Sequence, residues 1–147
     1  TSSNGTSWTS RSGASDYLYN VTYGNSRFLT LNDTTSSGAT FYTSSDGTSW
    51  TSGTSDVTDQ TRIGLTYGNS TFISVGWSGS ILTSSDGTTW TSRTSGTSDI
   101  LFGVTYGNGN FVAVSYQGNI FTSPDGTTWT LRTSGTSQSL NNVIYSQ

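Results

Sequence analysis

The feature that most constrains this chain is a sequence repeat with a period of about 40 residues. Its clearest mark is a tryptophan that follows an acid or an asparagine by four residues. The pairs are Asn4 with Trp8, Asp46 with Trp50, Asp86 with Trp90 and Asp125 with Trp129, and the tryptophans are separated by 42, 40 and 39 residues. A second block, Tyr-Gly-Asn-x-x-Phe, occupies residues 23–28, 67–72 and 106–111, and a fourth copy begins at Tyr145. Two independent motifs with one period and one phase predict a series of like structural units.

Each repeat contains four short strand signals separated by turn residues. In the third repeat we predict strands A to D over residues 101–106, 111–115, 119–122 and 129–133, with turns at 107–110, 117–118 and 125–126. Four antiparallel strands in about 40 residues are typical of a β-propeller blade. We therefore predict an all-β fold, a β-propeller of four-stranded antiparallel blades with about 3.5 blades per chain.

The composition supports strands over disorder and excludes several classes of partner. There are 5 Trp, 8 Tyr and 6 Phe, which is too many aromatic residues for a disordered chain. The net charge is −3 with only 5 basic residues, so no nucleic-acid-binding face is expected. No apolar run approaches the roughly 20 residues of a membrane span, so no membrane insertion is expected. A Ser-, Thr-, Gly- and Asn-rich surface without lysine suggests an extracellular or cell-surface protein.

The repeat also assigns structural roles to its residues. We expect the ring of each repeat tryptophan to lie between blades and to donate its N–H to a nearby acceptor. We expect each acid, and Asn4 in the first copy, to accept hydrogen bonds from backbone amides of its turn. Two further sets should face neighbouring blades or the core: Val21, Leu65, Val104 and Val143 on strand A, and Phe28, Phe72 and Phe111 on strand B.

The number of repeats raises a question of closure. We expect one propeller domain or partial propeller, with repeats at about 1–39, 40–80, 81–119 and 120–147. Propellers need at least four blades, so an open one would expose its apolar blade faces. We therefore expect a homo-oligomer, a two-fold dimer or a larger assembly that completes the ring. In the dimer, the strand near Tyr145 would share a blade with the partner's N-terminal strand D. The alternatives are an excerpt of a longer chain, consistent with the start at Thr1 and the absence of Met, and an open helical assembly.

The segment Ser84-Ser85-Asp86-Gly87-Thr88-Thr89-Trp90 resembles the Asp-box, a recurrent hairpin of sialidases and related bacterial propellers. It is one residue shorter than the usual Asp-box. The stretch from Phe111 to Trp129 resembles a repeat of large bacterial surface and secreted proteins. The resemblance covers the whole chain and implies a propeller fold, in which the Asp-box is a structural turn and not an active site.

The residues argue against catalysis. Sialidase chemistry would imply an arginine triad and a Tyr–Glu pair, yet the acids here are all Asp, and Arg11, Arg93 and Arg132 each follow a repeat tryptophan by three residues. Without His or Cys there is no Ser–His or Cys–His nucleophile, and a transition-metal site is not expected, although Asp and carbonyl oxygens could form a Ca²⁺ site. We predict no enzyme and no cofactor. A glycosidase-like enzyme is the least favoured alternative, because Asp46, Asp86 and Asp125 are assigned to turns.

The connections between strands B and C carry the candidate binding residues. Trp77 and Tyr116 stand there at matching positions, whereas the first such connection has an insertion, residues 32–37. Aromatic rings beside polar groups suit stacking on a sugar, so we predict carbohydrate or another surface ligand, with Arg62 as an anion contact. Alternatively, Trp77 and Tyr116 extend strand B and pack on the next blade. A structural module of a cell surface, phage or filament is the other function that the sequence favours.

Overall fold

The computed structural model describes residues 1–2, 4–10, 18–32, 40–54 and 62–146. Within these residues the chain forms three four-stranded antiparallel sheets, each a meander in which the strands pair in chain order. The first sheet comprises β1 (Leu18–Gly24), β2 (Arg27–Asn32), β3 (Thr40–Ser44) and β4 (Thr51–Thr54). The second comprises β5 (Arg62–Gly68), β6 (Thr71–Gly76), β7 (Ile81–Ser84) and β8 (Thr91–Arg93), with a short 3₁₀ turn, η1 (Trp77–Gly79), after β6. The third comprises β9 (Leu101–Gly107), β10 (Asn110–Ser115), β11 (Ile120–Ser123) and β12 (Thr130–Arg132).

The turn residues explain why the first two strands of each sheet pair tightly. Asn25 and Ser26 both have positive φ, as do Asn69 and Ser70, and Asn108 and Gly109. Two-residue hairpin turns of this kind match the right-handed twist of the flanking strands. Each Tyr-Gly-Asn block therefore ends strand A and starts a hairpin.

The register is the same in all three sheets. Tyr23 pairs with Phe28, Tyr67 with Phe72 and Tyr106 with Phe111 across the first hairpin of each sheet. Each strand A also contains an irregularity near its start, where one residue is left out of the pairing. A repeated register with a repeated bulge confirms that the repeats fold as like units.

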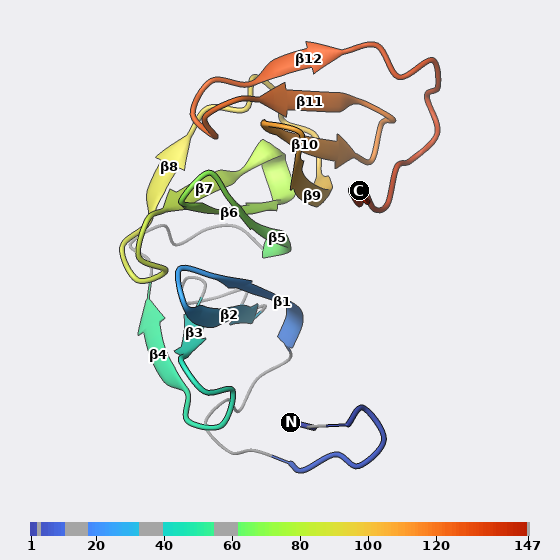
Figure 1. Ribbon diagram of the computed structural model, residues 1–147. Coiled ribbons are helices and arrows are strands. Elements are labelled where there is room, and N and C mark those ends of the chain that lie inside the picture. Colours follow the sequence, from blue (N-terminus) through green and yellow to red (C-terminus); the bar gives the residue numbers. More distant parts are fainter. Residues whose placement is uncertain (3, 11–17, 33–39, 55–61, 147) are drawn as a thin grey trace.

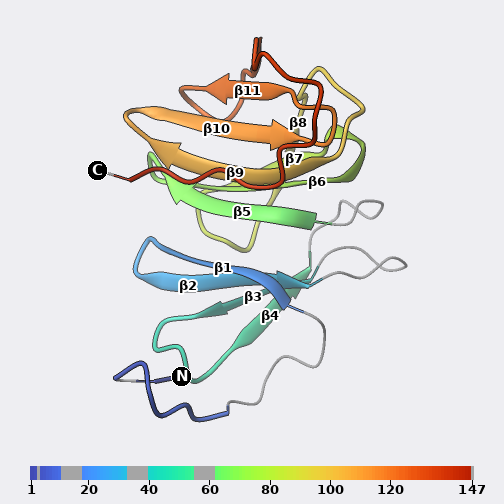
Figure 2. The same cartoon turned by 90° about the vertical axis from the view of Figure 1, so that its right-hand side faces the viewer.

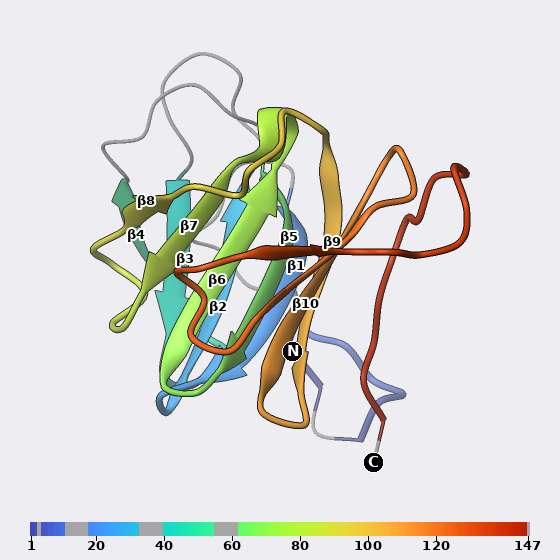
Figure 3. The same cartoon turned by 90° about the horizontal axis from the view of Figure 1, so that it is seen from above.

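The sheets lie side by side along an arc, with their first strands on the inner side and their last strands on the outer side (Figure 1). β5 packs against both β1 and β9, and the view from above shows these three strands close together (Figure 3). The predicted all-β, partial-propeller architecture is therefore confirmed.

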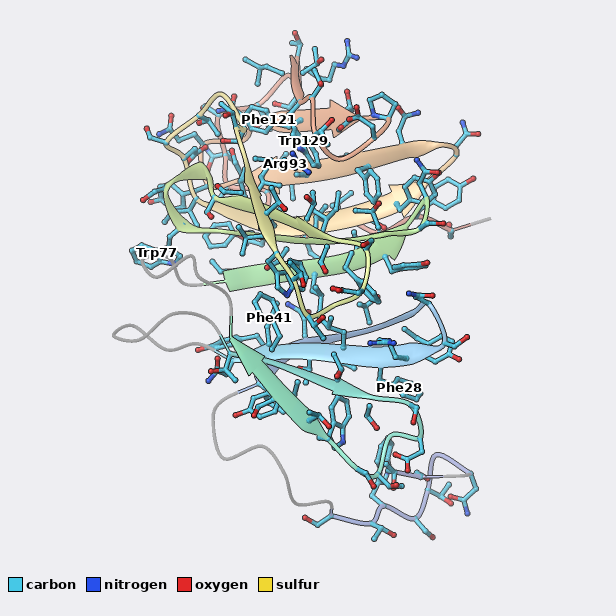
Figure 4. All side chains as sticks on the ribbon, turned by 90° about the vertical axis from the view of Figure 1, so that its left-hand side faces the viewer. Phe28, Phe41, Trp77, Arg93, Phe121 and Trp129 are labelled. Carbon is cyan, nitrogen blue, oxygen red and sulfur yellow. The ribbon has the colours of Figure 1, made fainter. Side chains whose placement is uncertain are left out.

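The cores lie between neighbouring sheets. Leu29, Leu31 and Phe41 of the first sheet form one cluster with Phe72 and Leu82 of the second. The ring of Trp90 stacks on Phe41 at 4.1 Å between centroids, and Phe41 points from its sheet toward the next one (Figure 4). A second cluster joins the second and third sheets, and Trp129 packs against it. Each sheet therefore depends on its neighbours to bury its apolar sides.

Three expectations about single residues need correction. Trp8 is 73% exposed and Val21 is 64% exposed, although both were expected to face a neighbouring blade. The reason is the same for both, since in the described residues no complete sheet precedes the first one. The indole nitrogen of Trp90 is buried without a hydrogen-bond partner, whereas that of Trp129 donates to Gly126 O at 3.0 Å as expected.

Two expected strands are also absent from the assigned elements. The segment that contains Val143 and Tyr145 follows β12 and lies beside Gly103 of β9, but it has no strand assignment. Residues 1–10, described except for residue 3, likewise form a hairpin without strands, closed by a hydrogen bond from Thr9 N to Thr1 O at 2.8 Å. A strand is assigned from its backbone ladder, and the described residues offer neither segment a full neighbouring strand.

Candidate ligand-binding face

The second-to-third-strand connection of the second sheet presents Trp77 to solvent. Gly76 N donates to Ser80 O at 3.0 Å and Ser80 N to Trp77 O at 2.9 Å, which closes η1 into a tight turn. Ser78 and Gly79 have positive φ, so the backbone reverses directly after the tryptophan. Trp77 is 50% exposed and projects away from the sheets (Figure 4).

The equivalent connection of the third sheet presents Tyr116 in the same way. Ser115 N donates to Asn119 O at 3.0 Å, and Gly118, with positive φ, donates to Ser115 O at 3.2 Å. Tyr116 is 57% exposed. Its ring packs against that of Phe102 in an edge-to-face arrangement, with 6.1 Å between the ring centroids. β2 and β10 end on the same side of the molecule (Figure 2), and the repeated topology places the end of β6 there too.

The segments that follow β8 and β12 pack against these turns. A Cβ atom on Gly79 would lie 1.9 Å from Thr97 O, and one on Gly118 would lie 2.7 Å from Thr136 O. Glycine is therefore required at both positions, because the loop backbone passes directly over the turn. Beside the first contact lies an open groove of about 560 Å³ lined by residues 78–80 and 92–98. Beside the second lies one of about 550 Å³ lined by Asn119 and residues 131–137.

Asp99 fixes the Tyr116 turn to the start of β9. Its carboxylate is buried and accepts hydrogen bonds from Ile100 N at 2.9 Å, from Gln117 N at 3.1 Å and from the Ser115 hydroxyl. Tyr116 N donates to Ile100 O at 2.9 Å. The position of Asp99 directly before strand A predicts a cap of the preceding loop, but it does not predict this contact with the Tyr116 turn. The signal that we missed is that Ser115 replaces the glycine found at position 76.

The acidic turns lie at the third-to-fourth-strand hairpins. In each, one carboxylate oxygen accepts from the backbone amides two and three residues later, at 2.7 and 2.8 Å for Asp46 and at 2.8 Å for both amides of Asp86. Asn4 makes the same pair of contacts at 3.0 and 2.9 Å. Hydrogen bonds hold the pKa of each carboxyl well below its ordinary value. The largest contribution comes from the amide of Ser49 for Asp46, from the amide of Thr89 for Asp86 and from the hydroxyl of Thr127 for Asp125. These acids therefore serve the fold.

Other predicted residues are not part of this face as described. Arg62 begins β5, but its side chain lies outside the described residues, as does most of the insertion at 32–37. Arg93 and Arg132 lie on outer strands, where each Nε donates to a threonine hydroxyl of the preceding strand at 2.9 and 2.8 Å. In the part of the chain that the structure describes, no three metal-ligating side chains come together. No helix among these residues is long and apolar enough to span a membrane.

Three meander sheets, with their first strands adjacent on the inside of one arc and apolar cores between them, define part of a β-propeller. Two solved propeller structures are similar to it. One is described as "YCF48 bound to D1 peptide", with a TM-score of 0.62, 18% sequence identity, and coverage of 78% of this chain and 38% of that chain. The other is YCF48 from Cyanidioschyzon merolae, with a TM-score of 0.63, 15% identity, and coverage of 84% of this chain and 42% of that chain. This chain thus spans about two fifths of their length, and the likeness concerns the fold.

No protein-family model matches the sequence, and no curated protein does. The resemblance to Asp-box repeats therefore stays a prediction.

Proposed function

We propose that this chain is a non-catalytic β-propeller module that binds carbohydrate through the face that carries Trp77 and Tyr116. The observation that carries the proposal is the exposure of these two rings, 50% and 57%, at matching positions of neighbouring sheets. The exposed part of an aromatic ring that a fixed turn holds in water can gain further apolar contact from a ligand. One face of a sugar ring is apolar enough to stack on it.

The surroundings of the rings suit the rest of a sugar. The two grooves beside the turns are lined mostly by serine, threonine, glycine and arginine residues, whose hydroxyl, amide and guanidinium groups can bind sugar hydroxyls. Asp99 and the two glycine contacts hold the turns in place, so little ordering is needed on binding. Arg62 as an anion contact remains a prediction of the sequence.

A glycan array followed by calorimetric titration tests this function. We expect Trp77→Ala and Tyr116→Ala each to weaken the binding of the selected glycan by about tenfold or more. Trp8→Ala is the matched control, because Trp8 is also exposed but lies on the N-terminal hairpin. Absence of glycan binding, or equal binding by all variants, would refute the proposal.

A peptide ligand is the second candidate. It is favoured by one observation, the similarity to a YCF48 structure described as bound to a peptide. A peptide library screened beside the glycan array distinguishes the two ligand classes, and the Trp77→Ala and Tyr116→Ala variants test whether the selected ligand binds this face. Selection of peptides and not of glycans would support this candidate.

An extracellular or cell-surface location is also part of the proposal, and it rests on a surface rich in serine, threonine and glycine without lysine. An antibody against the folded chain should label intact source cells. A purely structural module, a homo-oligomer or filament without a small ligand, is the remaining alternative. Sedimentation and electron microscopy would show particles well above 15.6 kDa in that case.

A further inference from the structure

Each Tyr-Gly-Asn block joins one sheet to its neighbours in both directions. The ring of Tyr67 lies over Gly24 of the sheet before it, where a Cβ atom would be 2.0 Å from the ring. Tyr106 lies over Gly68 and Tyr145 over Gly107 in the same way, at 2.0 and 2.1 Å. The tyrosine of each block is thus received by the glycine of the preceding block.

The asparagine of the block makes the contact in the other direction. Asn25 Nδ2 donates to Ser85 O at 3.2 Å, and Asn69 Nδ2 donates to Pro124 O at 3.4 Å. Both acceptors belong to the residue before the acid in the turn of the following sheet. The block therefore determines which sheet edges can lie next to each other.

Tyr23 is the tyrosine of the first block, and no described glycine receives its ring in this way. The ring is 59% exposed, whereas Tyr67 and Tyr106 are half-buried. Val21 is exposed as well, while its counterparts Leu65 and Val104 pack into the cores between sheets. Beside Val21 lies a mostly apolar groove of about 320 Å³, lined by Leu18, Tyr19, Asn20, Val21, Thr30 and Trp50.

The outer part of this face is already covered by the N-terminal hairpin. Thr1 Cγ2 lies 3.6 Å from the Cβ position of Gly47, just as Thr43 Cγ2 lies 3.5 Å from that of Gly87. Residues 1–10 thus stand where the third and fourth strands of a preceding blade would stand. What the described residues leave open is the place of its first two strands.

We propose that this open face docks a β-hairpin of the same repeat type, whose Tyr-Gly step receives the ring of Tyr23. The three internal contacts are the template for this one, so the interface continues an arrangement that the molecule already uses. The segment around Tyr145 of a second copy would fit this face poorly, because Ser146 stands where the other blocks have glycine. The Cβ atom of a serine there would overlap the ring of Tyr23.

The first test uses the whole chain and a synthetic peptide with the sequence of residues 100–115, which spans one A–B hairpin. We expect saturable binding, measured by isothermal titration calorimetry. We expect binding to become weaker by about tenfold or more with the Gly107→Ala peptide or with the Tyr23→Ala chain. Gly107 does not have a positive φ, so alanine leaves the peptide backbone unstrained. Tyr116→Ala, on a different surface, is the protein control and should bind normally, which separates this proposal from the carbohydrate function.

An isolated hairpin is only marginally stable in water, so the second test joins the hairpin covalently to the chain. A copy of residues 100–121 is joined before Thr1, which corresponds to Thr122 in the repeat, so that the preceding blade is completed in register. The extended chain should unfold at a higher temperature than the original, and Gly107→Ala in the added copy should abolish the gain. Equal midpoints for all three chains would overturn the proposal. A stable dimer of the original chain that Tyr23→Ala dissociates would overturn it too, because a second copy would then occupy the face.

Discussion

At the scale of the residue, the acid before each tryptophan acts through the backbone of its turn. The Asp86 carboxylate accepts from the amides of Thr88 and Thr89, and the Ser84 hydroxyl donates to it at 2.9 Å. Asn4 makes the same backbone contacts without a charge. An acceptor oxygen without a charge can therefore also close such a turn.

This comparison gives a prediction for two substitutions at one position. Asp86→Ala leaves the two amides of a partly exposed turn without their acceptor and should lower the free energy of unfolding by about 1–2 kcal/mol. Asp86→Asn should cost less, because the amide oxygen can accept in the same place. Urea denaturation of the three chains measures both effects. An equal loss for alanine and asparagine would show that the charge is the essential feature.

The depressed pKa values of the acids predict the pH dependence of stability. In the folded state the pKa of Asp46, Asp86 and Asp125 lies below the ordinary value of 3.8. A depressed folded-state pKa means that the ionised form stabilises the fold, fully above the ordinary value and progressively less as the pH falls below it. Thermal unfolding at decreasing pH should show the midpoint falling below about pH 4. The triple variant D46N/D86N/D125N should lose most of this decrease, and an unchanged acid dependence in it would contradict the assignment.

At the scale of the element, the close approach of neighbouring A strands depends on glycine. Gly68→Ala would place a methyl group against the ring of Tyr106 and should lower the free energy of unfolding by about 1–3 kcal/mol. Gly53→Ala is the matched control, since nothing lies within 4 Å of its Cβ position. Denaturation of both variants measures the difference. Equal stability of the two variants would refute the role of Tyr106 as the neighbouring group.

The sequence predicted the strands well and their neighbours less well. The turn residues Asn25, Asn69 and Asn108 and the alternating apolar residues determine hairpins locally, so the four-stranded units could be predicted. The exposure of Trp8 and Val21 could not, because it depends on which sheet lies next to them. The packing of Tyr67, Tyr106 and Tyr145 on glycines of the preceding block was missed for the same reason. The repeat period gives the length of one sheet, but it does not say which residues of neighbouring sheets are in contact.

The candidate site shows the same limit. Trp77 and Tyr116 could be singled out because they are aromatic residues in turns that otherwise hold small and polar residues, and the turns that present them follow from Gly79 and Gly118. The contact of Asp99 with Ser115 joins residues 16 apart, and neither residue belongs to the two repeat motifs. A contact between residues outside those motifs cannot be found from the period of the motifs.

At the scale of the whole molecule, stability comes from contacts between units. Phe41, Phe72 and Phe111 are almost fully buried, and the cores that bury Phe41 and Phe72 are shared by two sheets. A chain of such units is stabilised by the interfaces between neighbouring units. A sheet at either end has only one neighbour, so one of its apolar sides stays exposed. This explains the exposed apolar residues on β1 and after β12.

The most direct measurement of this dependence is the thermal unfolding of one sheet alone, residues 62–93, beside that of the whole chain. Far- and near-ultraviolet circular dichroism would follow both. We expect a cooperative transition for the whole chain and none for the isolated sheet, because its two apolar sides lose the sheets that cover them. A cooperative transition with native-like near-ultraviolet signal in residues 62–93 alone would contradict the claim that these units fold only against one another.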